Sequence, residues 1–302
     1  MAKKLSPVMN RYIESVANIH QTPQAYEPVF TPRELVQATL PHSNPGDDLP
    51  TWSRRNGNYV LGIQPGWNYD KEESFGYPYG TIPRLLIYWI ATEVLRKKQR
   101  RLELGDTLNG FMDKVGLSPE TGGGKRSDAK RLREQMDRLF HARITFQYSA
   151  EMQQVRYRNR LDMQVAPKTQ VWWSERQPDQ QVMFGSWIEL GEDFYQAIME
   201  CSVPIDMRAL RALKKSPLAL DLYAWATFRA VAATRKGRMQ KVPWKALAQQ
   251  FGSDYARPRD FKTKARAQLK KIQLVYPDLN LEEQDDYLII RPSLPAIPEK
   301  VK

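Results

Sequence analysis

The stretch TIPRLLIYWIATEVLRKKQRRLELGDTLNGFMDKVGL, residues 81–117, decides which fold the sequence predicts. Residues 81–98 form a long apolar segment that predicts a helix, and RLELG at 101–105 predicts a short strand. DTLNGFMDKVGL predicts a second helix, because its apolar residues recur on one helical face. A third helix, SDAKRLREQMDRLFHA, precedes two alternating segments, RITFQYS and QVRYRNRLDMQV, which predict a two-stranded ribbon. Helix, strand, helix, helix and hairpin is the order of a winged helix-turn-helix domain.

The same order of elements recurs in the C-terminal part of the chain. SPLALDLYAWATFRAVAAT predicts a long helix with Ser216 as N-cap and Pro217 at the first helical position. KVPW predicts a short strand, KALAQQFG a second helix and residues 255–277 a third, before LNLEEQDDYLIIRPS, a hairpin with an acidic turn. YWIAT matches YAWAT at one constant offset, 223 − 88 = 135. The sequence therefore predicts an α+β chain with two tandem winged helix-turn-helix domains.

The predicted organisation has three parts. Residues 1–76 are rich in proline and predict an irregular N-terminal arm, with a short helix capped by Thr31 and a hairpin turning at Asn56-Gly57. Residues 77–200 form the first winged-helix domain, whose sheet is completed by VWW and SWIEL. Residues 201–302 form the second.

The composition favours a polyanion as partner. Lys and Arg number 46 against 34 Asp and Glu, which gives a net charge of +12 and a pI near 9.6. The most apolar run, residues 85–95, is far shorter than the roughly 20 residues of a bilayer span, so no membrane helix is expected. The N-terminus has no apolar signal segment, so we expect a cytoplasmic protein. The single cysteine, Cys201, excludes an intramolecular disulfide and a multi-cysteine metal cluster.

The sequence shows no convincing active site. The loop SPETGGGKRS has Pro119 and Arg126 where a phosphate-binding loop needs glycine and Ser or Thr. His20, His42 and His141 are isolated, so the paired histidines that hold the metal of a rolling-circle nicking enzyme are missing. The acidic run EEQDD is better explained as a solvated hairpin tip than as a metal site. We therefore expect no catalytic residue, no cofactor and no metal.

The third helix of the second domain carries the strongest basic signal. At about 100° per residue, its apolar positions converge on one face, namely Phe261, Ala265, Leu269 and Ile272. A charge run on a helix is usually a solvated face, but hardly any acid is interleaved here for ion pairing. In helix-turn-helix proteins the N-terminal end of such a helix enters the major groove. We assign DNA contact to Arg257, Arg259, Lys262, Arg266 and Lys270, whereas Lys264 and Lys271 lie on the flank.

The first domain offers a more mixed surface. Its third helix interleaves cations with acids, so we expect it to contact the DNA backbone more than to read bases. The residues assigned there are Lys125, Arg126, Lys130, Arg131 and Arg133. In the ribbon segment VRYRNR, the arginines at 156, 158 and 160 share one face of a strand, as in a wing that follows a groove edge. A protein or RNA surface stays an open alternative for Arg156 and Arg158.

Several segments also carry a family resemblance. PYGTIPRLLIYWIATEVLR, LELGDTLNGFM, RLREQMDRLF, WIELGEDFYQAI, VPIDMRALRALKKSPLALDLYAWATFR and WKALAQQFGSDY resemble the plasmid-encoded RepA family of replication initiators over residues 56–292. The resemblance implies an initiator in the bacterial cytoplasm that binds repeated origin sequences, iterons, through two winged-helix domains. It also implies opening of the duplex and recruitment of the host initiator and replicative helicase. Related initiators dimerise and control plasmid copy number, so a homodimer is a further implied partner.

Two other functions stay open from the sequence. A transcriptional repressor could use the same two domains without initiator activity. A dimeric repressor suits a palindrome, whereas tandem domains in one chain suit a direct repeat. A nicking enzyme is disfavoured because the histidine pair is missing.

Overall fold

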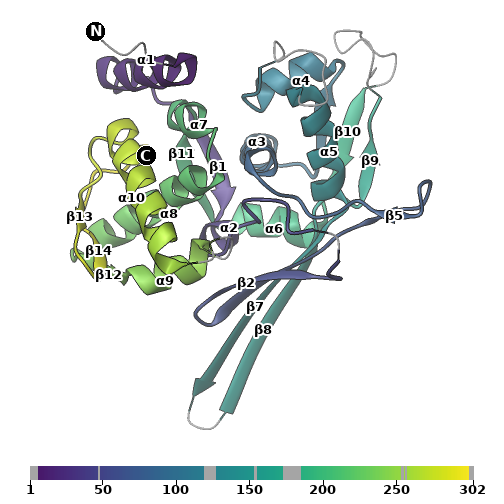
Figure 1. Cartoon of the computed structure of the whole chain (residues 1–302). Coiled ribbons are helices and arrows are strands. Elements are labelled where there is room, and N and C mark those ends of the chain that lie inside the picture. The colour runs from purple at the N-terminus through teal and green to yellow at the C-terminus, as the bar shows by residue number, and fades with distance from the viewer. Residues whose placement is uncertain are drawn as a thin grey trace. The chain divides into compact units, whose positions relative to one another are not determined.

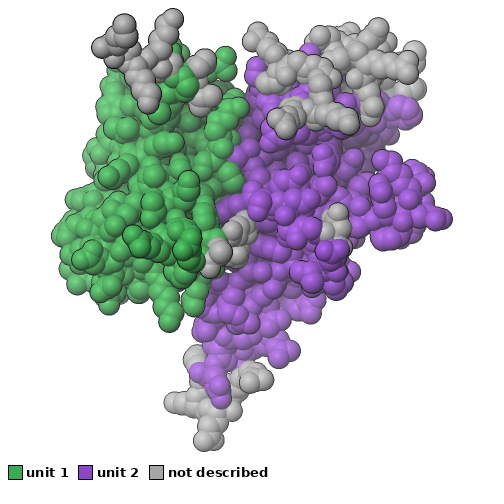
Figure 2. All heavy atoms as spheres, viewed as in Figure 1, with its two compact units in different colours: residues 1–31, 203–302 green, residues 32–202 purple. Residues whose placement is uncertain are grey.

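The computed structural model describes residues 6–46, 48–118, 127–152, 155–172, 185–252, 255 and 257–298, except for the side chains of Pro7, Val8, Met152, Val155 and Arg156. Helices alternate with several small sheets (Figure 1), which confirms the predicted α+β class. The chain forms two compact units (Figure 2). Unit 1 contains Met1–Thr31 and Val203–Lys302, and unit 2 contains Pro32–Ser202.

Unit 2 contains the predicted succession of helices and strands. A three-stranded antiparallel sheet has the order β6-β10-β9, and α3 packs on α5 and α6. Apolar side chains cover nearly the whole circumference of α3, which explains why it is buried on all sides. The elements are α3 (Thr81–Lys97), β6 (Arg101–Gly105), α4 (Leu108–Lys114), α5 (Asp128–Phe140), β9 (Lys168–Gln170), β10 (Ser186–Glu189) and α6 (Glu192–Glu200).

Unit 1 repeats this arrangement. As predicted, Ser216 caps the long helix by accepting a hydrogen bond from the Ala219 amide at 3.2 Å. The sheet order β12-β14-β13 corresponds to β6-β10-β9, since in both sheets the third strand in sequence lies in the middle. The elements are α8 (Pro217–Arg235), β12 (Gln240–Pro243), α9 (Trp244–Phe251), α10 (Pro258–Val275), β13 (Leu281–Glu283) and β14 (Tyr287–Ile290).

A separate four-stranded sheet in unit 2 corrects the interpretation of the ribbon. β7 (Arg143–Met152) and β8 (Val155–Gln164) pair as predicted, but the sheet order is β2-β3-β7-β8. β2 (Trp52–Asn56) and β3 (Tyr59–Gln64) form the predicted hairpin of the N-terminal arm, and Gly57 takes a positive φ of 56° in its turn. Because β6 pairs with β10, the β7–β8 ribbon is an insertion between α5 and β9 and not the wing of that sheet.

The residues of the predicted N-terminal arm are divided between the two units. Residues 32–76 belong to unit 2 and contribute α2 (Arg33–Gln37), β2, β3, β4 (Trp67–Asn68) and β5 (Glu73–Ser74). Residues 1–31 belong to unit 1, where α1 (Pro7–Gln21) packs on α7 (Met207–Leu213) and α10, and β1 (Pro28–Pro32) pairs with β11 (Ser202–Asp206). The short helix expected to start at Thr31 begins at Arg33, after Pro32. The division into domains at residues 76 and 200 stays a prediction.

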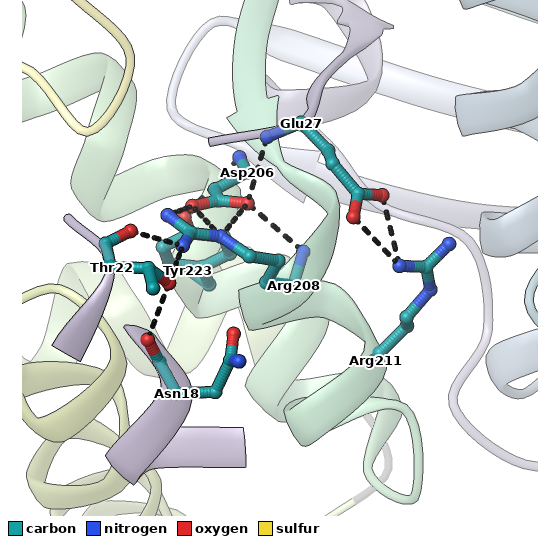
Figure 3. Close-up of polar contacts among 7 residues, drawn as sticks. All are labelled: Asn18, Thr22, Glu27, Asp206, Arg208, Arg211 and Tyr223. Atoms are coloured by element: carbon teal, nitrogen blue, oxygen red, sulfur yellow. Dashed lines mark hydrogen bonds and ion pairs between the residues drawn. The ribbon is translucent and has the colours of Figure 1, made fainter. Parts of the chain in front are cut away.

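A polar network attaches the N-terminal segment to α7 within unit 1 (Figure 3). The Asp206 carboxylate accepts from the Arg208 guanidinium at 2.8 Å, and both side chains are at most 10% exposed. Arg208 also donates to the Thr22 carbonyl oxygen at 2.7 Å, and Arg211 pairs with Glu27 at 2.9 Å. Because a buried charged pair is destabilised when one partner is removed, this network fixes the path of residues 18–27.

The α1 helix reaches the C-terminal end of α10. The Tyr12 hydroxyl donates to the Lys271 carbonyl oxygen at 2.9 Å, and His20 Nε2 lies 2.8 Å from the Leu274 carbonyl oxygen. Burial raises the pKa of Tyr12 to about 12. Leu274 is in the last turn of α10, where helix carbonyls lack intrahelical partners, so the His20 contact occupies one of these groups.

Candidate nucleic-acid interface

The orientation of α10 is the one predicted from its apolar face. Phe261, Ala265, Leu269 and Ile272 are all at most 1% exposed. Pro258 stands in the first turn and Arg257 is the N-cap residue. The Arg257 guanidinium is 81% exposed and lies 3.2 Å from the Asp260 carboxylate, so the N-terminal end of the helix presents a cation to solvent.

Two of the α10 cations assigned to DNA contact are engaged within unit 1. Lys262 Nζ and Arg266 Cζ lie 5.6 Å and 5.5 Å from the ring centroid of Trp244. Lys262 donates to the Asp285 carbonyl oxygen, and Arg266 Nε lies 3.0 Å from Glu283 Oε2. The Arg266 contact is close enough for an ion pair but lacks the alignment of a hydrogen bond. Both cations therefore contact the β13–β14 hairpin.

The accessible cations of α10 form a different set. Arg259 and Lys270 are exposed, as is Lys264, which the helical wheel placed on the flank. Within the described part of the chain these three side chains make no ion pair. Lys271, also assigned to the flank, is exposed too, but its Nζ lies 6.0 Å from the ring centroid of Tyr12 in α1. The solvent-facing side of α10 therefore combines Arg257, Arg259, Lys264 and Lys270.

The corresponding helix α5 has its charge partly neutralised, as the sequence indicated. Lys130 is exposed, and Arg131 pairs with Asp128 at 3.1 Å. Arg133 is half-buried. Lys125 and Arg126 lie outside the described residues. The outer surface of α5 is thus less uniformly positive than that of α10.

The four-stranded sheet has an open polar face that extends the predicted arginine ribbon. Arg158 and Arg160 are exposed on β8, and Arg160 pairs with Asp162 at 2.8 Å. Hydrogen bonds from Arg160 and then from the Thr145 hydroxyl lower the pKa of Asp162. In the strand register Arg156 lies opposite Glu151, and the structure does not describe its side chain.

Sequence reasoning missed two arginines on this face. In register, Arg55 lies opposite Val60, Val60 opposite Gln147 and Gln147 opposite Arg160, so these positions share one face. Arg143 lies on the same face by alternation along β7, and Arg55 and Arg143 are both exposed. The sequence shows Arg54 and Arg55 side by side in the predicted hairpin, but the structure is needed to show that Arg54 is buried and Arg55 exposed. Placing Arg55 on the same face as the ribbon arginines requires knowing that β3 of the arm pairs with β7.

The β13–β14 hairpin has the opposite charge. Glu282, Glu283, Asp285 and Asp286 lie in or beside its turn. Glu282 lies 2.5 Å from Arg291, and the hydrogen bond from that guanidinium lowers the pKa of Glu282. Carboxylates at this position would repel phosphate, so this hairpin is a poor surface for the DNA backbone.

His, Cys, Asp and Glu side chains are common metal ligands in proteins. Among those that the structure describes, no group of three or more His, Cys, Asp or Glu side chains is arranged to hold a metal ion. None of the described helices combines the length and apolar character needed to cross a membrane.

The fold and surface define an α+β chain of two similarly built units, with exposed cations on α10 and on one face of a four-stranded sheet. Residues 77–245, more than half of the chain, match the family model described as plasmid encoded RepA protein. The chain belongs to this family of plasmid replication initiators, as the sequence resemblance implied. Among curated proteins no match is found. The matched region begins before α3 and ends in α9, so α10 and the β13–β14 hairpin follow it.

Proposed function

We propose that the chain initiates plasmid replication by binding repeated double-stranded origin sequences, iterons, through two winged-helix domains. The observation that carries this proposal is the repeated architecture, in which β6-β10-β9 and β12-β14-β13 have the same strand order and each unit has a basic third helix. Bound protein would promote opening of the origin and recruit the host initiator and replicative helicase. We propose that it acts in the cytoplasm without enzymatic activity.

In this proposal α10 is the helix that reads bases. Third helices of this fold enter the major groove with their N-terminal residues against base edges. Arg257 and Arg259 occupy that end of α10 and are exposed, and arginine can contact guanine through two parallel hydrogen bonds. Lys264 and Lys270 lie further along the exposed side, where lysine would neutralise phosphates.

Unit 2 would contribute mainly to backbone binding. Its α5 has cations that are partly paired with acids, which suits phosphate contact more than base discrimination. The open sheet face adds Arg55, Arg143, Arg158 and Arg160 from three strands. A flat arginine-bearing face of this kind favours sequence-independent attraction to a polyanion.

A footprint on the origin of the replicon that encodes the chain tests the proposal. We expect protection of direct repeats with one protomer per repeat, because two tandem domains in one chain suit an asymmetric site. Protection of an isolated palindrome alone would instead support a transcriptional repressor without initiator activity. A covalent protein–DNA product, formed on supercoiled origin plasmid with magnesium, would contradict the non-enzymatic role.

A further inference from the structure

The β4–β5 hairpin of unit 2 displays two large aromatic side chains to solvent. Trp67 is 51% exposed and Tyr69 is 86% exposed. The hairpin is small, since Trp67 pairs with Ser74 and Asn68 with Glu73 across its two short strands. Figure 1 shows it projecting from unit 2 beside the β5 label. Single exposed aromatics are common, but two on one short hairpin form a concentrated apolar surface.

The hairpin is built as a rigid support. At its tip, the Asn68 side-chain oxygen accepts from the amides of Asp70 at 3.0 Å and Lys71 at 3.3 Å. Glu72 completes the turn with a positive φ of 52°. These contacts fix the backbone that carries Tyr69, so little conformational entropy would be lost when the ring is bound.

The base of the hairpin is attached to the C-terminal end of α5. The Phe75 amide donates to the Gly66 carbonyl oxygen at 3.0 Å, and the Phe75 ring stacks on His141 at 4.4 Å. A Cβ at Gly66 would lie 2.4 Å from His141 Cβ, so glycine permits this close approach. The aromatic tip therefore has a fixed position relative to α5.

The charge around the aromatics argues against DNA as their partner. Asp70, Glu72 and Glu73 are exposed at the tip and Lys71 is the one cation among residues 67–74, which gives a local charge of −2 in a chain of +12. Lys71 Nζ lies 3.9 Å from Glu73, a loose surface pair. Carboxylates on this hairpin would repel phosphate, whereas they would attract a positively charged protein surface.

We propose that the β4–β5 hairpin docks on a folded replication protein of the host, which receives Trp67 and Tyr69 in an apolar pocket with a basic rim. Tryptophan and tyrosine dominate binding hot spots because they bury a large area at low entropic cost. The negative charge of the hairpin is the reason for expecting a basic rim around this pocket. This inference rests on the proposed function, which requires contact with host replication proteins, and it identifies the surface for that contact.

The test uses the full chain and the purified initiator and replicative helicase of the plasmid's host. The double variant Trp67→Ala/Tyr69→Ala should lose about a hundredfold in affinity for one of these proteins. Its affinity for origin DNA should stay unchanged. Leu294→Ala is the matched control, because Leu294 is an exposed apolar residue of unit 1, and it should change neither affinity.

A second variant tests the charge without removing any apolar contact. Glu72→Lys/Glu73→Lys changes two exposed side chains, so the fold is expected to be retained. It should weaken binding to the same host protein about tenfold at low salt, and less at high salt.

Three outcomes would overturn the inference. Wild-type affinity of both variants for the host proteins would show that the hairpin is not the contact. Equal losses for DNA and protein would make the hairpin a DNA contact or part of the folding core. A wild-type chain that binds origin DNA but neither host protein would remove the partner and leave the DNA-binding role intact. A wild-type chain that bound neither the host proteins nor origin DNA would overturn the proposed function itself.

Discussion

Each unit places a hairpin directly after its basic helix, and the two hairpins have opposite charge. The β7–β8 ribbon follows α5 and exposes Arg158 and Arg160 on an open sheet face. The β13–β14 hairpin follows α10 and brings Glu283 within 3.0 Å of Arg266. In unit 2 the hairpin adds positive charge beside a partly neutralised helix, whereas in unit 1 it neutralises part of a strongly positive one.

This difference shows that the number of cations on a helix overstates how many are available to an outside partner. Lys262 and Arg266 are cations like Arg259 and Lys270, but their charged groups contact Trp244 and the acidic hairpin. A cation that already has a partner gains less from phosphate, because the existing contact must be lost or shared. The acids that face a cation therefore decide whether it is available.

The largest effect is expected from the sheet face of unit 2. The triple variant Arg55→Ala/Arg143→Ala/Arg158→Ala should weaken DNA binding about a hundredfold near physiological salt and lessen the salt slope by about three units. We expect the loss on specific and random DNA alike, since these side chains would contact phosphates. Titrations over a range of salt measure both values. An unchanged slope would show that this face does not meet DNA.

Arg259 and Arg266 give the sharpest contrast within α10. Arg259→Ala should cost about 1–3 kcal/mol on the specific site if this residue reads a base, and little on random DNA. Arg266→Ala should instead lower the thermal midpoint, because the ion pair with Glu283 and the contact with Trp244 are lost. Fluorescence titration and thermal unfolding of both variants distinguish the roles. A larger DNA defect for Arg266 would reverse the comparison.

Lys264 and Lys270 test the position of the exposed side of α10. Each change to alanine should weaken binding to all DNA sequences by about fivefold and lessen the salt slope by about one unit. Lys271→Ala serves as the control, because Lys271 contacts Tyr12 of α1. A slope that falls for Lys270 but not for Lys264 would show that the helical wheel, which placed Lys264 on the flank, was the better guide.

The smallest effect is expected from changes in the acidic hairpin. The informative result is whether DNA affinity rises or falls. Glu283→Gln combined with Asp286→Asn removes two carboxylates next to the basic helix and should raise DNA affinity about threefold at low salt. The gain should vanish at high salt because exposed charges are screened. Weaker binding by this variant would mean that the hairpin orders α10 more than it opposes phosphate.

The sequence predicted the local features of α10 well and its neighbours poorly. Periodicity correctly identified Phe261 and Leu269 as buried, because a helix face follows from spacing alone. It could not show that Trp244 and Glu283 reach Lys262 and Arg266, since those contacts depend on how separate elements pack. The pairing of β3 with β7 was not predicted for the same reason, because this ladder joins residues far apart in the chain.

The helix α1 was missed because proline dominated the interpretation of the first residues. Pro7 is favourable in the first turn, and the Ser6 hydroxyl accepts from the Met9 amide at 3.3 Å as an N-cap. These start signals are visible in the sequence. That α1 would pack on α7 and α10 depends on the network around Asp206 and Arg208, which no local pattern shows.

Unit 1 is made from both ends of the chain, and this has a consequence for the order of folding. The hydrogen bond from Arg208 to Thr22 closes a separation of 186 residues, and the whole of unit 2 lies between the two partners. During synthesis from the N-terminus, unit 2 can complete its own contacts as soon as it leaves the ribosome. The α1 helix must wait for α7 and α10, so a helix that is synthesised before unit 2 finds its binding surface only after unit 2 has been made.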